Sequence, residues 1–541
     1  MRRPDFFAPK SRPATILLLA ALAYFCATAA RDLQPFDSAE FALNAVQLGV
    51  GHPPGQPFYL LLGALFVRIA PIGAPWALSL FSAFATVLAI FVALRIARML
   101  RGGESNVLDA ILVGTACLLP GVWDMATRPE VYSLAALLLC AGVGLILTGS
   151  NRRIPAAGLL FGLGASVNPA MAVAIALSVA PALLAWLLQK PDRRKVLAFA
   201  GAVGAGLIGL LPYGILPILG AHPHGAVVWG EPLHGDSLRH YLAGRDYRSW
   251  HLTLDEFAHN LAAALAWLLH TGQLPLILLG AIGFLRSPLP IFARIIPVLA
   301  TLFSLALIAL NHPFLPTNPD YDGYLLPAVW LSAAGLPLLA APLLMRPRGR
   351  LIAAALALAL LAFGARAGTP LGSRNRATDH VTRHIAAALI ADAPAGGLLV
   401  LESDHLVFPA LYMTEVEHWR DDIIVLNAGW SSSSWYFRHL AARHPDLPPV
   451  PAAPSRNERL AAFFAASHKP VAAQNVALAA LAGRPFPCHD QTSQTLGEAT
   501  FHRPALEGLD LPFRPPATPW FRASRDLLQP ATGAAFSALG H

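Results

Sequence analysis

The sequence predicts an α-helical polytopic membrane protein followed by a small α/β domain. The 541 residues are 55% hydrophobic and only 13% charged, whereas about a quarter of the residues in a soluble globular chain are charged. The apolar residues gather in long runs separated by short polar junctions. After about residue 367 these runs give way to the shorter apolar segments of a soluble domain,. These three observations predict the fold class.

Eleven apolar runs suggest membrane-spanning helices, each of which needs about 20 mostly apolar residues. The segment 52–71 is short and broken by prolines, so we expect it to lie as an amphipathic piece on the outer face. The first run follows a short basic leader, a pattern shared with cleaved signal peptides, but the many later runs favour an uncleaved helix. The runs, 11 within a range of 10–12, lie near 14–30, 76–94, 107–123, 131–149, 154–167, 170–188, 196–218, 262–285, 291–310, 322–344 and 350–366.

The charges at the junctions between these runs predict the sidedness. Basic clusters alternate with acidic junctions, and basic loops are cytoplasmic by the positive-inside rule. We therefore expect a bacterial-type inner membrane protein with a cytoplasmic N-terminus and an outer C-terminus, and no nucleic-acid partner despite the net charge of +8. The basic clusters are Arg95, Arg98 and Arg101; Arg152 and Arg153; Lys190, Arg193, Arg194 and Lys195; Arg286 and Arg294; and Arg346, Arg348 and Arg350. The acidic junctions contain Asp37 and Glu40; Asp124 and Glu130; Glu231 and Asp236; and Asp320 and Asp322.

This topology divides the chain into a membrane domain, 1–366, and an extracytoplasmic α/β domain, 367–541. The membrane domain would have a first outer loop over 31–75 and a large outer loop over 219–258. In the second domain, "GGLLVLESD", "DDIIVLNAG" and "HKPVAAQNV" read as strands, and "HLVFPALYMTEVEHW" and 456–467 as helices,. This order favours parallel pairing. No glycine-rich nucleotide fingerprint follows the first strand, and the four cysteines include no CxxC zinc pattern.

The stretch "FDSAEF…GHPPG" in the first outer loop holds the first candidate site residues. Asp37 and Glu40 are three residues apart and share one face of a helical turn,. Two carboxylates this close near a low-dielectric boundary favour one poised base. The same spacing also suits a helix cap, with Asp37 at the N-cap and Glu40 at N3. His52 precedes a rigid proline turn, where it either binds a phosphate or caps a carbonyl.

Further polar residues gather at the same face. Arg128 and Glu130 start a span in "TRPEVYSL", where they either contact a substrate or pair with each other and the helix dipole. The loop 227–252 combines Trp, His and Arg residues, which suits sugar and phosphate contacts but also an interfacial aromatic belt. The turn "NPDYDGYLLP", 318–327, is open to the same two interpretations.

Taken in order, these segments resemble the membrane family catalogued as domain of unknown function 2723. "FDSAEFALNAVQLGVGHPPGQPFYLLLG" is similar to its opening D-S-x-E-F…H-P-P-G-x-P-x-Y signature, and "PEVYSLAALL" to its E-V-Y-x-L motif. "WGEP…YLAGRDY", "DYDGYLLP" and "ESDHLVFPALYMTEVEHWRDDIIVLNAGW" resemble later motifs of the family. The resemblance covers about 35–437 in consistent order.

This family is similar to GT-C glycosyltransferases and to transmembrane protein 260-like protein O-mannosyltransferases. The resemblance implies transfer of a sugar, a mannose-like hexose, from a polyprenyl-phosphate donor to a protein or envelope-glycan hydroxyl at the membrane lipid surface. It implies no cofactor and no metal ligands. Asp37 would be the base and Glu40 would orient it or the sugar. The substrate-binding residues would be His52, Arg128, Glu130, Arg245, Tyr247 and Asp322, with Arg128 or Arg245 holding the lipid phosphate.

Two departures from the family pattern concern the later motifs. The C-terminal motif reads E-S-D-H in place of G-D-N-D, which weakens a role for Glu402 or Asp404. "SVNPAMA", with Asn168 and Pro169, stands where a histidine pair is expected.

Two other classes compete with a glycosyltransferase. A transporter or flippase predicts charges at the bilayer midplane and inverted repeats, and the sequence indicates neither. A non-catalytic membrane scaffold would be indifferent to Asp37→Asn.

Overall fold

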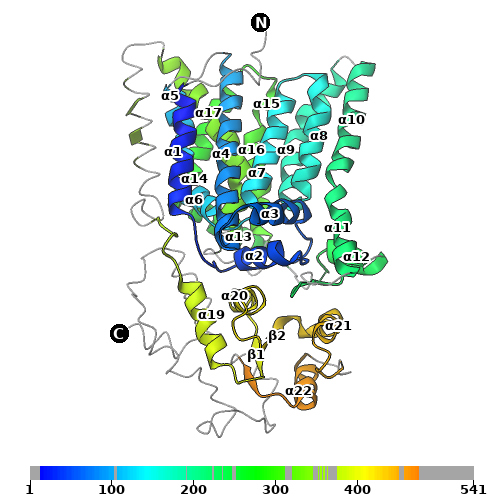
Figure 1. Ribbon diagram of the computed structural model, residues 1–541. Helices are drawn as coiled ribbons and strands as arrows, with labels where there is room; N and C mark the ends of the chain where they lie inside the picture. Colours follow the sequence, from blue (N-terminus) through cyan, green and yellow to red (C-terminus); the bar gives the residue numbers. More distant parts are fainter. Residues whose placement is uncertain are drawn as a thin grey trace.

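The computed structural model describes residues 12–102, 107–189, 192–221, 225–233, 235–245, 252–310, 318, 320–344, 374–449 and 456–473, with short helical pieces between 351 and 362. It has two parts (Figure 1). The first is a bundle of helices, and the second, beneath it in this view, combines helices with a small sheet.

The bundle consists of apolar helices that run side by side (Figure 1). Among the described residues, four helices are long and apolar enough to cross a membrane, or six if each of two bent pairs counts as one span. The chain is therefore a multi-pass membrane protein. The helices are α1 (Arg12–Thr28), α4 (Ala74–Arg101), α7 (Tyr132–Leu147), α8 (Ile154–Ala165), α9 (Pro169–Leu188), α10 (Arg193–Gly209), α16 (Ile296–Ala309) and α17 (Asp320–Leu344), with the short η2 (Asn151–Arg153), η3 (Leu211–Gly214) and α15 (Ile291–Arg294) between them.

The two bent pairs correct the predicted straight spans over 107–123 and 262–285. The first pair joins α5 (Val107–Gly114) and η1 (Thr115–Leu118) to α6 (Pro120–Thr127) at 74°. Pro120 causes this break, because it lacks the N–H that a continuous helix needs. The second pair joins α13 (Leu254–His270) to α14 (Gln273–Leu285) at 87°, and Gly272 supplies a left-handed residue at the bend (φ 78°),. The predicted span 350–366 lies largely outside the described residues.

Close helix contacts in the bundle depend on small residues. Where α14 meets α17, a Cβ on Gly280 would lie 2.0 Å from the backbone oxygen of Ser332. Small residues let apolar helices approach closely where lipid offers no hydrophobic drive. The departure at "SVNPAMA" also has a structural role, because the Asn168 side chain accepts a hydrogen bond from the Met171 N–H at 3.0 Å and so caps α9,.

Two helices lie across one end of the bundle, α2 (Asp37–Gln47) and α3 (Pro57–Ile69) (Figure 1). At 13 residues, α3 is about 20 Å long and too short to cross a bilayer core of about 30 Å, as the sequence predicts for 52–71. Two further helices, α11 (Ile215–Ala221) and α12 (Gly235–Leu242), lie at the same end.

The second part contains the three predicted strands, all parallel, in the order β2-β1-β3. They are β1 (Leu398–Leu401), β2 (Ile424–Asn427) and β3 (Val471–Ala473). Four helices surround them: α19 (Val381–Asp392), α20 (Asp404–Glu415), α21 (Ser434–Arg443) and α22 (Arg456–Ser467), with the short η6 (Ala428–Ser432) after β2. Because α20 begins just past the carboxyl end of β1, its first residues lie at the edge of the sheet where ligands of parallel sheets usually bind.

Polar bonds and an aromatic cluster join the two parts. In Figure 1, α20 lies directly beneath α2. The Trp229 ring, between α11 and α12, packs edge-on against Trp430, with centroids 4.8 Å apart. The charged contacts include Asp32 with Arg383 (2.6 Å), Asp32 with His380 (2.8 Å), Glu231 with Arg438 (2.7 Å) and Asp124 with Arg376. The C-terminal part is therefore held against the face of the bundle that carries α2.

Candidate active site

Asp37 and Glu40 lie in the first turn of α2, where the positive end of the helix dipole favours carboxylates,. The N-cap residue is Phe36, and neither carboxylate makes a capping bond within the described residues. The helix-cap interpretation of these two residues is therefore wrong. The carboxylates are free for other contacts, and both turn toward His52.

Glu40 fixes the orientation of His52. Its side chain is completely buried, and a buried carboxylate needs partners to offset lost hydration. Glu40 Oε1 accepts the His52 backbone N–H at 2.8 Å, and Oε2 lies 2.6 Å from His52 Nδ1. With Nδ1 donating to Glu40, the other ring nitrogen, Nε2, faces the accessible side of the cluster.

Asp37 is the accessible member of the cluster. Its Oδ2 lies 3.6 Å from His52 Nε2, and its side chain is 31% exposed; the Gln56 amide nitrogen lies 3.0 Å from the same ring nitrogen. Desolvation lowers the pKa of His52, but the charges of Asp37 and Glu40 outweigh it and raise this pKa to about 10, so the ring is cationic at neutral pH. Desolvation raises the pKa of Asp37 above its ordinary value, against the attraction of His52,. A carboxylate with a raised pKa is a better proton acceptor.

Residues of the predicted large outer loop brace the turn that carries His52. Val50 forms a parallel bridge with Val228, and the Tyr241 hydroxyl donates to the Gly51 carbonyl at 2.6 Å. Gly55 has φ 75°, and a Cβ there would lie 2.6 Å from the Tyr241 oxygen. Only glycine fits this turn without strain, so two segments distant in sequence fix the position of His52.

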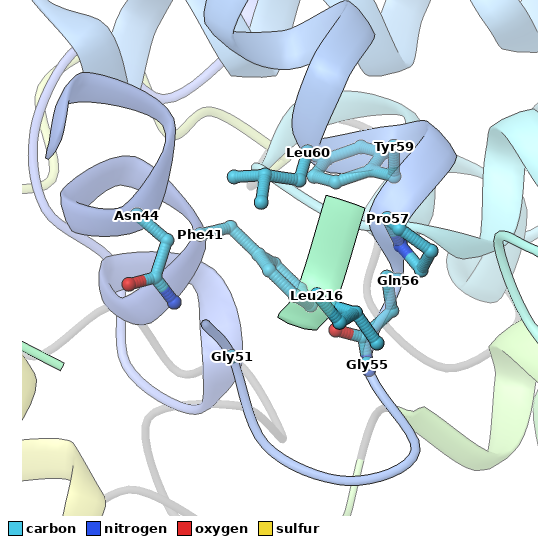
Figure 2. Close-up of a pocket in the computed structure, with 9 residues that line it drawn as sticks. All are labelled: Phe41, Asn44, Gly51, Gly55, Gln56, Pro57, Tyr59, Leu60 and Leu216. Atoms are coloured by element: carbon cyan, nitrogen blue, oxygen red, sulfur yellow. The ribbon is translucent and has the colours of Figure 1, made fainter. Parts of the chain in front are cut away.

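A recess opens beside the cluster, between α2 and α3 (Figure 2). It holds about 340 Å³ of empty space, its open mouth included. Asn44 projects from α2 at its rim and is buried, and neither atom of its amide has a hydrogen-bond partner among the described residues. Such an amide is suited to bind a polar group that enters the recess. The lining residues are Phe41, Asn44, Gly51, Gly55, Gln56, Pro57, Tyr59, Leu60 and Leu216.

Asp37, Glu40 and His52 are also the described residues that could hold a metal ion, since one ligand atom of each lies within 4.8 Å of the others. Glu40 Oε2 and His52 Nδ1, however, already bind each other at 2.6 Å. A metal would have to displace that bond and deprotonate the ring.

Arg128 lies in a second, closed cluster beside the first. Its guanidinium is fully buried and contacts three carboxylates: Asp124 (3.1 Å), Glu130 (2.7 Å) and Asp320 (2.8 Å). Desolvation lowers the pKa of Arg128, but these carboxylates outweigh it and raise the pKa above its ordinary value. The sequence places Arg128 and Glu130 among the substrate contacts. In the structure they bind each other, so a phosphate would have to replace a carboxylate to reach the guanidinium.

The other predicted site residues lie apart from Asp37 or outside the described residues. Asp322 accepts hydrogen bonds from Trp267 (3.2 Å) and from Gln273, and so braces the bend between α13 and α14. Arg245 is exposed shortly after α12. Tyr247 is not among the described residues. The roles assigned to these three remain predictions.

Sequence reasoning missed His405, at the start of α20, and gave Asp404 little weight. His405 Nδ1 accepts the Phe36 N–H at 2.9 Å. Desolvation, with repulsion from Glu40 and Asp37, raises the pKa of Asp404 to about 7 although its side chain reaches solvent. Asp404 and His405 follow β1 in the "ESDH" segment. Polar residues after a buried strand indicate a candidate site at the carboxyl edge of a parallel sheet.

Comparison with solved structures identifies the class of fold. The structure of ArnT from Cupriavidus metallidurans bound to undecaprenyl phosphate aligns with a TM-score of 0.52 over 80% of this chain and 88% of that chain, at 15% sequence identity. The chain thus has the ArnT-like GT-C fold, with a small parallel sheet near its C-terminal end. At this level of identity the likeness concerns the fold alone.

The sequence also matches a known family over part of its length. Residues 37–190 match the family described as protein O-mannosyl-transferase TMEM260 N-terminal domain. The predicted resemblance is confirmed.

Two protein O-mannosyl-transferases are similar in sequence to parts of this chain. The mouse (Mus musculus) protein O-mannosyl-transferase TMEM260 is 26% identical over 276 residues, which are 47% of this chain and 37% of that protein. The Dictyostelium discoideum protein O-mannosyl-transferase tmem260 is 29% identical over 115 residues, 20% of this chain and 14% of its own length. The matched region thus spans well under half of either relative.

Proposed function

We propose that the protein is a membrane glycosyltransferase that moves a sugar from a polyprenyl-phosphate donor to a hydroxyl acceptor, with Asp37 as general base. The observation that carries the proposal is the partly exposed Asp37 carboxylate beside a histidine that buried Glu40 holds in place. The family match over 37–190, which begins at Asp37, supports it. The GT-C fold, shared with an ArnT structure that holds undecaprenyl phosphate, supports the class of donor.

In the proposed reaction, the Asp37 carboxylate takes the proton of the acceptor hydroxyl. The acceptor oxygen forms a bond to the anomeric carbon of the sugar, and the bond from that carbon to the phosphate oxygen breaks. The electron pair leaves on the polyprenyl phosphate. His52 keeps the Asp37 carboxylate in place through its Nε2, because Glu40 occupies Nδ1. Positioned base catalysis of this kind contributes about 10²–10⁴-fold.

The position of the cluster suits a lipid-linked donor. Asp37 lies in α2, which crosses the end of the bundle. A polyprenyl tail stays in the bilayer, so the reacting carbon of its sugar sits at the membrane surface. We assign the amides of Asn44 and Gln56, at the recess beside the cluster, to contacts with polar groups of the substrates. A mannose-like hexose is the proposed sugar, and a protein or envelope glycan the proposed acceptor.

The proposed topology follows from the charge pattern. We infer about 11 spans, a cytoplasmic N-terminus in an inner membrane, and an outer α/β domain from 367 onward that borders the site. Cysteine labelling at Gln56 and Ser431 with an impermeant reagent in intact cells checks the sidedness, with a denatured sample to correct for burial of these positions. Protection of both positions in intact cells, with labelling after the membrane is opened, would reverse the orientation.

The test of function is transfer from radiolabelled polyprenyl-phosphate sugars by the purified full-length protein, wild type against Asp37→Asn. Transfer by the wild type and its loss in the variant support the proposal. If the wild type transfers no sugar from any donor to envelope acceptors, the protein is not this enzyme. A transporter would instead move the labelled lipid across vesicles, with or without Asp37.

A further inference from the structure

We propose that His405, in the C-terminal part, is a positioning residue for Asp37. It accepts a hydrogen bond from the backbone N–H of Phe36, the residue that directly precedes Asp37. Through this bond the C-terminal part sets the direction in which α2 presents its first carboxylate. The catalytic consequence rests on the proposed function, but the contact itself does not.

Phe36 has a backbone conformation that does not persist unaided. Its φ is 60° and its ψ is −147°, a region that residues with a Cβ rarely enter. Such strained residues persist only where their surroundings hold them, and they concentrate at functional sites. Because Phe36 is the N-cap of α2, its two backbone angles determine where the chain enters the helix and where Asp37 points.

Three contacts hold Phe36. The His405 Nδ1 accepts its N–H at 2.9 Å, and the His405 ring packs edge-on against the Phe36 ring with centroids 4.5 Å apart. On another side, the Arg128 guanidinium lies 5.7 Å from the ring centroid. The hydrogen bond requires a ring nitrogen without a proton. Desolvation, with Arg128 nearby, lowers the pKa of His405 to about 4, so the neutral ring is available as an acceptor.

The bond belongs to a pairing of α2 with α20 along their whole length. Phe36 meets His405 where both helices begin, and Gln47 donates to the Glu415 carbonyl at 3.4 Å where both end. These two bonds place the helices side by side in the same direction, and Figure 1 shows α20 beneath α2. Of these two bonds, the one at His405 acts next to Asp37, whereas the other acts at the far end of α2.

The experiment compares His405→Ala, His405→Gln and His405→Asn in the full-length protein in lipid nanodiscs. An Asn side chain places its oxygen near the position of Nδ1, while Gln places its oxygen near Nε2. The first readout is hydrogen exchange of the Phe36 amide. We expect faster exchange in His405→Ala and His405→Gln and protection in His405→Asn. This readout is independent of sugar transfer.

The second readout is kcat and the donor KM for sugar transfer. We expect His405→Ala to lower kcat by about 10–100-fold with little change in KM, since misplacement of a reacting group by about 1 Å costs on that order. His405→Asn should restore most of kcat. In a Phe36→Gly background, His405→Ala should cost less, because glycine adopts the Phe36 conformation without help.

The matched control is Arg438→Ala, which breaks the contact of the C-terminal part with Glu231 (2.7 Å) at an exposed position. We expect it to change neither readout. Equal exchange at Phe36 in all His405 variants would overturn the proposal. So would a loss of kcat in His405→Asn as large as in His405→Ala. Absence of transfer by the wild type, with the expected exchange pattern, would overturn the proposed function and leave the contact intact.

Discussion

The molecule has two neighbouring clusters of buried charge that differ in what they leave available. In the Arg128 cluster, the three carboxylates of Asp124, Glu130 and Asp320 surround one fully buried guanidinium. In the Asp37 cluster, Glu40 is buried and bound to His52 Nδ1, but Asp37 is 31% exposed and 3.6 Å from Nε2. The first cluster is closed to ligands, and the second presents a carboxylate to them.

This difference in exposure distinguishes charges that hold helices in place from charges that can take part in proton transfer. A buried charge whose partners are all supplied by the protein contributes to the arrangement of helices, and removal of one partner leaves the others without compensation. A partly exposed charge with a perturbed pKa is a candidate for proton transfer. Ser38, next to Asp37, joins the clusters, because its hydroxyl accepts from Arg128 at 3.3 Å. The Arg128 cluster therefore supports the start of α2, and the Asp37 cluster depends on the position of that helix start.

The largest expected effect is on sugar transfer, through a change in the Asp37 cluster. Asp37→Asn keeps the size of the side chain but removes the proton acceptor, so transfer should fall by about 10²–10⁴-fold, while the melting temperature stays near that of the wild type. Radiolabelled sugar transfer and thermal denaturation in detergent measure the two quantities. Asp236→Asn, at a side chain that is 98% exposed, is the control and should change neither. Full activity of Asp37→Asn would assign the chemistry to another group.

A change in the Arg128 cluster should lower the stability of the protein. Arg128→Met leaves Glu130 and Asp320 without the cation that pairs with them, although Asp124 keeps its ion pair with Arg376. Breaking a buried pair in this manner costs about 3–5 kcal/mol of stability. Thermal denaturation should show the loss directly, and Arg239→Met, at an exposed position, should not. A variant that stays as stable as the wild type but loses affinity for the polyprenyl-phosphate donor would restore the predicted role of Arg128 as a phosphate ligand.

Glu40→Gln tests whether buried Glu40 controls His52 in the Asp37 cluster. The amide removes the negative charge beside His52 Nδ1, so the pKa of His52 should fall from about 10 toward its ordinary value. Loss of a charge-assisted hydrogen bond is worth about 1.5–3 kcal/mol, so kcat should fall by about 10–100-fold. The alkaline limb of the pH–rate profile should move to lower pH. An unchanged alkaline limb would show that His52 does not depend on Glu40.

The sequence predicts well those features that repeat along the chain and poorly those that depend on distant contacts. Long apolar runs predict the bundle, and short apolar segments alternating with helices predict the parallel sheet. The two bends lie at Pro120 and Gly272, within runs whose hydropathy predicts straight spans. Hydropathy does not distinguish a straight helix from one bent by 74°.

In the candidate site, too, the sequence predicts local groupings of residues but not contacts between distant ones. Asp37, Glu40 and His52 lie within one turn-rich stretch, so their proximity follows from local sequence. The partner of Arg128 at Asp320 is 192 residues away, and no local pattern distinguishes a guanidinium bound to three carboxylates from one free to bind phosphate. The contact between Phe36 and His405 joins residues 369 apart. Only the packing of the C-terminal part against α2 creates it.

A further expected effect is a pH dependence of stability at this last contact. His405 has a pKa of about 4 in the folded protein against an ordinary value of 6.5. Below pH 6.5 the unfolded chain therefore binds a proton that the folded one does not. Stability should fall as pH drops from about 6.5 to about 4, by up to about 1.4 kcal/mol per pH unit, and level off below.

Thermal denaturation between these pH values measures this slope, and His405→Asn provides the comparison because it keeps an acceptor but cannot titrate. Carboxylates elsewhere titrate equally in both proteins and cancel in the difference. The wild type should lose more stability than His405→Asn on acidification. Identical slopes would mean that His405 is not held neutral against Phe36, and that the C-terminal part contacts the start of α2 without a bond that acid can break.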